Sequence, residues 1–177
     1  MKISPEKIII NNNIQKLKKK IFLISGNEET YIKKIQEELI HRIKKSKEAT
    51  IVKKLNVSVD SLAADSSGDL FSSNYKIYIF ENPKEIDLEF LEKTDHMNSA
   101  IIISHTSLKT SSKTKRFFDA HKDLVSISCY KLLRENKSNL ISFFLQKNDL
   151  ELSRDCFWYL LENSSDYYQI FENEINK

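Results

Sequence analysis

The chain has 177 residues, of which 40% are hydrophobic and 10% aromatic, and its 28 basic and 25 acidic residues leave a net charge of +3. This is the composition of a globular protein with room for one sizeable domain and an appendage, and so balanced a charge does not by itself indicate nucleic-acid binding. The two cysteines, Cys129 and Cys156, have neither CxxC spacing nor a nearby histidine cluster, which argues against a disulfide scaffold or a zinc site.

Targeting and membrane segments are not expected. Residues 1–10 lack a basic start followed by a small-residue cleavage site. The longest apolar runs, such as 77–80 and 100–103, are strand-sized and too short to cross a bilayer. With its unpaired cysteines, the sequence predicts a cytoplasmic protein that has no contact with membranes.

Residues 1–135 alternate between strand and helix patterns. Ser4 and Pro5 begin a helix that we expect to run to Lys18. Short apolar runs predict five strands, at 21–24, 51–55, 76–80, 100–104 and 124–128. Between them, helical patterns cover 28–45, 59–67, 87–97 and 111–120. This alternation predicts an α/β domain with a mostly parallel five-stranded sheet and helices on both faces.

The periodicity changes at about Asn136. Three helical patterns follow, at 138–147, 153–162 and 166–176, joined by short polar stretches. We therefore expect a small helical domain over 136–177, and, because its last helix meets no stop signal, a truncated one.

Glycine content limits the chemistry. Gly26 and Gly68 are the only glycines, and a phosphate-cradling loop needs closely spaced ones. The turn at Gly26, Asn27 and Glu28 stands where a nucleotide-binding α/β protein carries its phosphate loop, yet it has no second glycine and no lysine followed by Ser or Thr. Glu28 would stabilise the helix dipole and repel a triphosphate. We interpret the turn as a degenerate or purely structural phosphate loop.

Other residues of catalytic type have structural interpretations that we favour. Glu81 ends the third predicted strand, where an acid for Mg²⁺ would lie, but no phosphate loop accompanies it. Ser104, His105, Asp119 and His121 include the residue types of a nucleophilic triad, without a nucleophile elbow. Cys129 is expected to be a small core residue. The sequence predicts no catalytic residue, metal or cofactor.

A basic segment, 109–118, places Lys113, Lys115 and Arg116 just before two phenylalanines. The favoured interpretation is a solvated cationic face above aromatic residues that pack inward. Phosphate contact with DNA through these three cations is the alternative.

Leu70 and Phe71 form the least ordinary feature. They are two large apolar residues in a polar stretch, 66–73, directly before a predicted buried strand. They could cover the edge of the sheet. Alternatively, they could form an exposed anchor for a hydrophobic pocket on a partner protein.

The order of these segments resembles a known family. Residues 21–28 (Ile-Phe-Leu-Ile-Ser-Gly-Asn-Glu) follow an N-terminal helix, and residues 69–73 (Asp-Leu-Phe-Ser-Ser) precede 76–82 (Lys-Ile-Tyr-Ile-Phe-Glu-Asn). With the strand at 101–104, the helix at 113–118 and the run at 171–175 (Phe-Glu-Asn-Glu-Ile), this order is similar to the delta subunit of the bacterial DNA polymerase III clamp loader.

The resemblance implies an AAA+-like fold without nucleotide binding and a non-catalytic role in DNA replication. It implies that Leu70 and Phe71 enter a pocket on the sliding clamp, the beta subunit, and help to open the ring. The implied partners are the gamma/tau and delta prime subunits and primed DNA. The family continues into a helical collar to which nothing in this sequence corresponds, so we expect a fragment or a reduced homologue. An ATPase of the same fold and a nucleic-acid-binding module remain alternatives.

Overall fold

In the computed structural model, the described residues are 1–11, 21–46, 48–55, 75–93 and 99–177. Strands occupy β1 (Lys2–Ile3), β2 (Ile21–Gly26), β3 (Ala49–Leu55), β4 (Tyr75–Glu81), β5 (Ser99–His105) and β6 (Leu124–Cys129). Helices occupy α1 (Pro5–Ile10), α2 (Glu29–Ser46), α4 (Leu88–Lys93), α5 (Lys113–Ala120), α6 (Arg134–Lys147), α7 (Arg154–Asn163) and α8 (Tyr168–Ile175). None of the described helices is long and apolar enough to span a membrane.

The strands form one parallel sheet in the order β1-β6-β2-β5-β4-β3. All five predicted strands are present, each within two residues of its expected bounds. The sixth strand, β1, was not predicted, because two residues carry no periodicity. It exists because Lys2 and Ile3 pair with Ser126 and Ile127 at the edge of β6.

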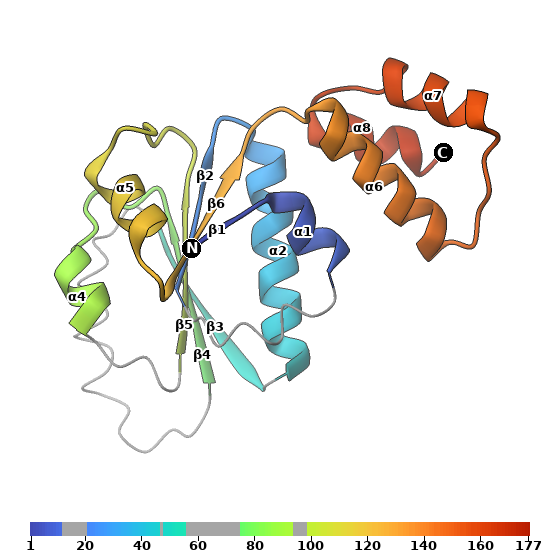
Figure 1. Cartoon of the computed structure of the whole chain (residues 1–177). Helices are drawn as coiled ribbons and strands as arrows, with labels where there is room; N and C mark the ends of the chain where they lie inside the picture. Colours follow the sequence, from blue (N-terminus) through green and yellow to red (C-terminus); the bar gives the residue numbers. More distant parts are fainter. Residues whose placement is uncertain (12–20, 47, 56–74, 94–98) are drawn as a thin grey trace.

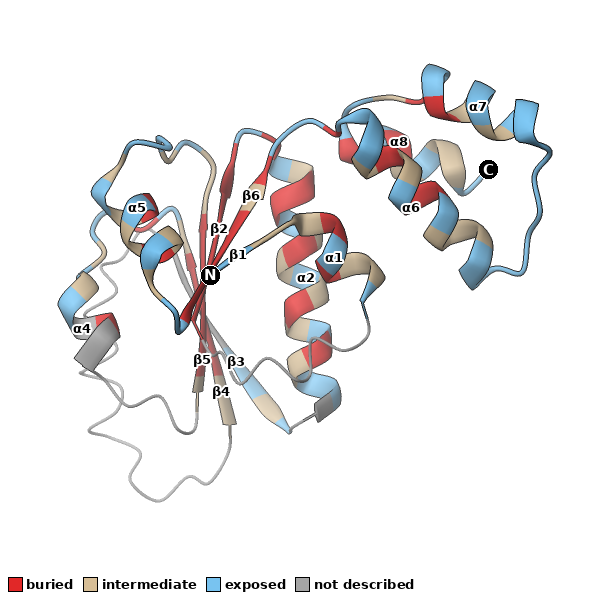
Figure 2. Ribbon diagram, viewed as in Figure 1, coloured by how far each residue is buried: buried red, intermediate tan, exposed pale blue. Residues whose placement is uncertain are grey.

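Helices cover both faces of the sheet, α1 and α2 on one and α4 and α5 on the other (Figure 1). The central strand β2 is buried along its whole length, and its side chains alternate between the two faces. Phe22 and Ile24 join the apolar cluster beneath α1 and α2, whereas Ile21 and Leu23 join the cluster beneath α4 and α5. The burial colours of Figure 2 show this double coverage.

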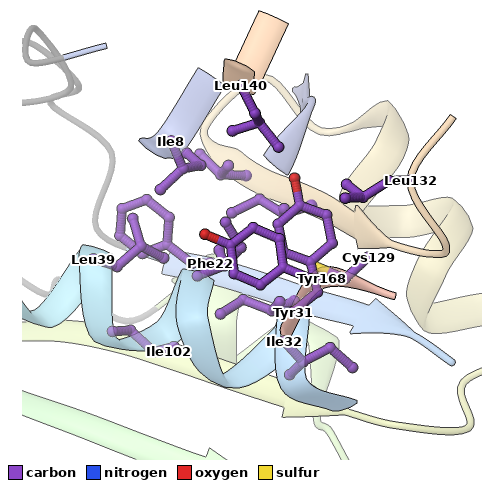
Figure 3. Packing of buried hydrophobic residues seen from close by; sticks show 14 of the residues in the cluster. Ile8, Phe22, Tyr31, Ile32, Leu39, Ile102, Cys129, Leu132, Leu140 and Tyr168 are labelled. Carbon is purple, nitrogen blue, oxygen red and sulfur yellow. The ribbon is translucent and has the colours of Figure 1, made fainter. Parts of the chain in front are cut away.

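Helix α2 carries the main apolar stripe of its layer. Within the helix predicted at 28–45, Tyr31, Ile32, Ile35, Leu39 and Ile43 recur at helical spacing; the first four are buried and Ile43 is half-buried. Figure 3 shows Tyr31, Ile32 and Leu39 packed with Phe22 and Ile102 from the sheet.

Two helix bounds within the described residues differ from the predictions by four residues or more. The helix predicted at 59–67 and the end of the one predicted at 87–97 lie outside the described residues. Helix α1 ends at Ile10 and not at Lys18, with Asn11 in an extended conformation. The Arg42 guanidinium accounts for this end, because it donates hydrogen bonds to the carbonyls of Ile9 and Asn11. Helix α6 begins at Arg134, four residues early, and the Asn136 side chain accepts a hydrogen bond from the Leu133 N–H at its start.

The C-terminal helices α6 and α8 lie beside α1 and α2 rather than over the sheet, and α7 packs on α6 at the outer side (Figure 1). Their apolar residues Leu140, Leu161 and Phe171 belong to the same buried cluster as Ile8 and Phe22. A single core therefore joins the α/β layer to the helices that follow it.

Candidate functional site

The β2–α2 turn is the first candidate site, and Gly26 ends the strand before it. Gly26 lies opposite Cys129 of β6 in the parallel register. A Cβ at position 26 would lie 1.7 Å from the Cys129 carbonyl oxygen, closer than any side chain can approach. The glycine is therefore required by the close contact of two strands, whatever else the turn does.

The backbone donors of the turn are already used. The N–H groups of Asn27 and Glu28 both donate to the Cys129 carbonyl oxygen, at 3.2 and 3.4 Å. In a phosphate-binding loop such donors point at the anion. Here a neighbouring strand accepts from them.

The N-terminus of α2 is capped by Glu28. Its carboxylate accepts from the Tyr31 N–H at 2.7 Å and from the Thr30 hydroxyl at 2.7 Å, while its carbonyl accepts the first helical bond from Ile32. The Glu28 side chain is buried. A carboxylate thus occupies the position at which a helix N-terminus binds an anion, and a triphosphate would have to displace it.

Residues from the C-terminal helices close over this end of α2. The Tyr31 ring stacks on Tyr168 of α8, with centroids 4.5 Å apart and planes within 4°, and Lys34 pairs with Glu172 at 2.7 Å. Burial, with the nearby Cys129 and Glu6, raises the pKa of the Tyr31 hydroxyl well above its ordinary value. Figure 3 shows the stacked pair beside Cys129.

Glu81, at the position of a Walker B acid, ends β4 and accepts a hydrogen bond from the Gln36 side chain at 3.2 Å. Asn82 follows with a positive φ of 48° and accepts from the Thr106 N–H at 3.0 Å, which ties the ends of β4 and β5 together. Within the described ranges, no group of three His, Cys, Asp or Glu side chains could hold a metal ion.

The residues of the triad interpretation each bind a different neighbour. The Ser104 hydroxyl points to the Phe80 carbonyl at 3.5 Å, and the Nδ1 atoms of His105 and His121 accept from the N–H groups two residues ahead. Asp119 pairs with Lys2 at 3.1 Å. These contacts stabilise local turns and the contact of α5 with the sheet.

The basic segment is divided by the fold. Lys113 and Arg116 are exposed on α5, whereas Lys115 is buried, with only 4% of its surface accessible. Its ammonium donates to the hydroxyls of Ser126 at 2.6 Å and Ser128 at 2.8 Å, and it pairs with Asp119 at 3.7 Å. The expectation that Lys115 belongs to a solvated cationic face is therefore wrong, because its side chain points inward to β6.

Leu70 and Phe71 lie outside the described residues. The flanking strands are described: residue 55 ends β3 and residue 75 begins β4, and the two strands pair in parallel from Ala49↔Tyr75 to Leu55↔Glu81. The nearest described residues on either side of the Leu-Phe pair thus lie in the sheet.

The fold is shared with a protein of known structure. The DNA clamp loader delta protein of Bacillus subtilis matches 97% of this chain with a TM-score of 0.66 and 9% sequence identity. The chain spans 56% of the length of that protein. At this identity the likeness shows the fold alone, and the predicted AAA+-like class, a parallel α/β sheet flanked by helices, is confirmed.

Weaker likenesses exist. They include domain III of the replication initiation protein DnaA from Thermotoga maritima, with a TM-score of 0.41, 13% identity, and 97% and 76% of the two chains covered. AMPPCP-bound DnaA from Aquifex aeolicus matches with a TM-score of 0.42, 17% identity, and 97% and 57% covered. Likeness of this degree supports no argument about the chain. No protein-family model matches the sequence, and no curated protein matches it.

Sequence reasoning missed the part that Cys129 plays in the turn. Its side chain is buried, as predicted, and burial raises the pKa of its thiol. Its backbone carbonyl, however, is what occupies the donors of Asn27 and Glu28. No sequence signal could have indicated this, because the group is main chain and its position depends on the pairing of β6 with β2.

Proposed function

We propose that this chain acts in DNA replication as a clamp-loader subunit that binds the sliding clamp and does not itself hydrolyse ATP. The observation that carries the proposal is the shared fold with a clamp loader delta protein over 97% of the chain. Its proposed partners are the clamp and the other loader subunits, gamma/tau and delta prime.

The β2–α2 turn supports the non-catalytic part of the proposal. Its two N–H donors are bound to Cys129, and its helix N-terminus is bound by Glu28. A subunit that lacks its own nucleotide would leave hydrolysis to its partners and contribute binding energy alone.

Leu70 and Phe71 are the proposed clamp-binding residues. The nearest described residues on either side of them, Leu55 and Tyr75, lie in the paired strands β3 and β4. Burying a Leu and a Phe side chain in an apolar pocket contributes roughly 3–6 kcal/mol before ordering costs. Such an energy suffices to bind a clamp and to bias a strained ring interface towards opening.

The test is clamp binding by a double variant. Leu70→Ala with Phe71→Ala should weaken the affinity for the cognate clamp by on the order of 100-fold, because both apolar anchors are lost. Surface plasmon resonance with immobilised clamp would measure it.

A matched control truncates two exposed apolar residues elsewhere, Leu133→Ala with Ile170→Ala, whose side chains are 71% and 50% exposed. This control should keep wild-type affinity. Unchanged affinity in the Leu70 and Phe71 variant would show that these two residues do not bind the clamp.

Contact with primed DNA is a second proposal, favoured by the exposure of Lys113 and Arg116 on one helix. Replacing both by glutamine should reduce the slope of log affinity against log salt by about 2, because two phosphate contacts are lost. A slope that does not change would exclude them. Lys115→Met should leave the slope unaltered, since its ammonium is engaged by Ser126 and Ser128.

A further inference from the structure

Helix α7 has one apolar face toward the core and an opposite, exposed face that carries two aromatic residues. Phe157, Leu160 and Leu161 recur at helical spacing and pack against the main core. The opposite face carries Asp155, Trp158, Tyr159 and Glu162 at the same spacing. We call these four residues the outer stripe. Figure 2 shows α7 at the margin of the molecule, with much of its surface exposed.

Both aromatic residues of the outer stripe are accessible, and the Trp158 ring is held by its neighbours. Trp158 is 42% exposed and Tyr159 is 72% exposed. The Trp158 ring meets Phe157 edge to face, with centroids 6.0 Å apart, and the Arg134 guanidinium lies 5.2 Å from its centroid. A ring fixed in this way loses little conformational freedom on binding, and such aromatic residues dominate the energy of protein interfaces.

The charge around the stripe is acidic. Residues 149–163 contain four carboxylates, at Asp149, Glu151, Asp155 and Glu162, against one cation, Arg154, whereas the whole chain is positive by 3. Glu162 pairs with Arg134 of α6. Asp149, Glu151 and Asp155 remain on the exposed surface at the start of α7, beside the exposed Leu150 and Leu152.

This charge selects the kind of partner. Carboxylates repel the phosphates of nucleic acid and the headgroups of anionic membranes, so neither suits the aromatic pair. An amphipathic helix with lysine or arginine beside an apolar stripe complements both features of the surface.

We propose that the outer stripe of α7 docks a cationic amphipathic helix of a partner protein. Trp158 and Tyr159 would contact its apolar residues, and Asp155 and Glu151 its cations. The inference does not depend on clamp binding by Leu70 and Phe71, because it concerns a different segment of the chain.

Trp158 is the only tryptophan of the chain, so its fluorescence reports on this surface directly. The probe is a tryptophan-free peptide of about 18 residues, long enough to form a helix, with leucines at helical spacing and lysines elsewhere. We expect a saturable blue shift of Trp158 emission that weakens with added salt. The matched control peptide has glutamate in place of each lysine and should produce no shift. An equal shift with both peptides, or none with either, would overturn the proposal.

Two sets of variants complete the test, each checked for folding by circular dichroism. Tyr159→Ala keeps the Trp158 reporter and should lower the affinity for the lysine peptide by about tenfold or more. Tyr167, which is 48% exposed, provides the control: Tyr167→Ala should leave that affinity unchanged. Glu151→Lys with Asp155→Lys should invert the preference, so that the glutamate peptide binds more tightly. If the charge-reversed protein still prefers the lysine peptide, the acidic residues do not select the partner and the proposal fails.

Discussion

At the scale of single residues, two positions of functional type have structural tasks. Gly26 lies where a phosphate loop would begin, but its lack of a side chain serves the contact with β6. Lys115 belongs to a basic segment, but its ammonium is bound inside the protein by two serine hydroxyls. The residue type alone would suggest that each binds a ligand. In the structure, each instead serves a contact inside the protein.

Gly26→Ala should lower the free energy of unfolding by about 1–3 kcal/mol or more, because β2 and β6 must separate to admit the new methyl group. Urea denaturation would measure it. Asn27→Ala is the matched control, since that side chain is exposed and its backbone N–H still reaches Cys129. Equal stability of both variants would show that the strands can shift without cost.

The stability difference between the wild type and Lys115→Met should depend on pH. Burial lowers the pKa of Lys115 below its ordinary value of 10.5. Between the folded pKa and 10.5 the unfolded chain holds a proton that the folded chain has released, so wild-type stability rises with pH relative to the variant. Below the folded pKa, the difference in unfolding free energy between the wild type and the variant should be constant. Urea titrations of both proteins across alkaline pH would measure it, and a difference that falls with pH would contradict the assignment.

At the scale of elements, α8 fixes the C-terminal helices to α2. The Tyr168 ring stacks on Tyr31, its hydroxyl donates to Glu172 at 3.0 Å, and Glu172 pairs with Lys34. These contacts lie directly after the turn at Gly26. In this fold, the same contacts that hold the helices also cover the N-terminal turn of α2.

Tyr168→Ala should therefore cost about 3–5 kcal/mol and loosen α8 from α2, because a buried ring and its stacking partner are lost. Hydrogen exchange of the α8 amides should become faster than in the wild type. Tyr167→Ala is the adjacent control, with a side chain 48% exposed, and should have little effect on the same amides. Equal exchange in the two variants would show that the stack does not hold the helix.

At the scale of the whole molecule, the parallel sheet is a fixed frame without a vacant phosphate site at its β2–α2 turn. The Cys129 carbonyl and the Glu28 carboxylate take the donors that nucleotide binding would need. This arrangement agrees with the proposal of a subunit that contributes surfaces rather than chemistry.

MgATP should accordingly leave the melting temperature unchanged. A ligand at 100 times its Kd would stabilise the folded state by about 2.7 kcal/mol, which corresponds to a rise of about 5–10 °C for a chain of this size. Differential scanning fluorimetry would detect such a rise. A concentration-dependent shift of that size would favour the ATPase alternative over the non-catalytic function.

Much of the fold could be predicted from the sequence because strands buried on both faces leave continuous apolar runs, as at 77–80 and 101–103. The predicted helix starts at 87 and 153 lie within one residue of the observed starts of α4 and α7, where the Asp87 and Ser153 side chains accept backbone N–H bonds. These signals are local, so the sequence carries them without reference to the rest of the chain.

The sequence by itself determined the alternation of strand and helix, the change of periodicity near Asn136 and the absence of a second glycine in the β2–α2 turn. Only the tertiary structure decided that β1 pairs with β6, that Lys115 is internal and that the Cys129 carbonyl occupies the turn. The reason is physical: each of these depends on β6 meeting another part of the chain, β1 and β2 through strand pairing and α5 through side-chain packing. Such contacts leave no periodic signal in either partner.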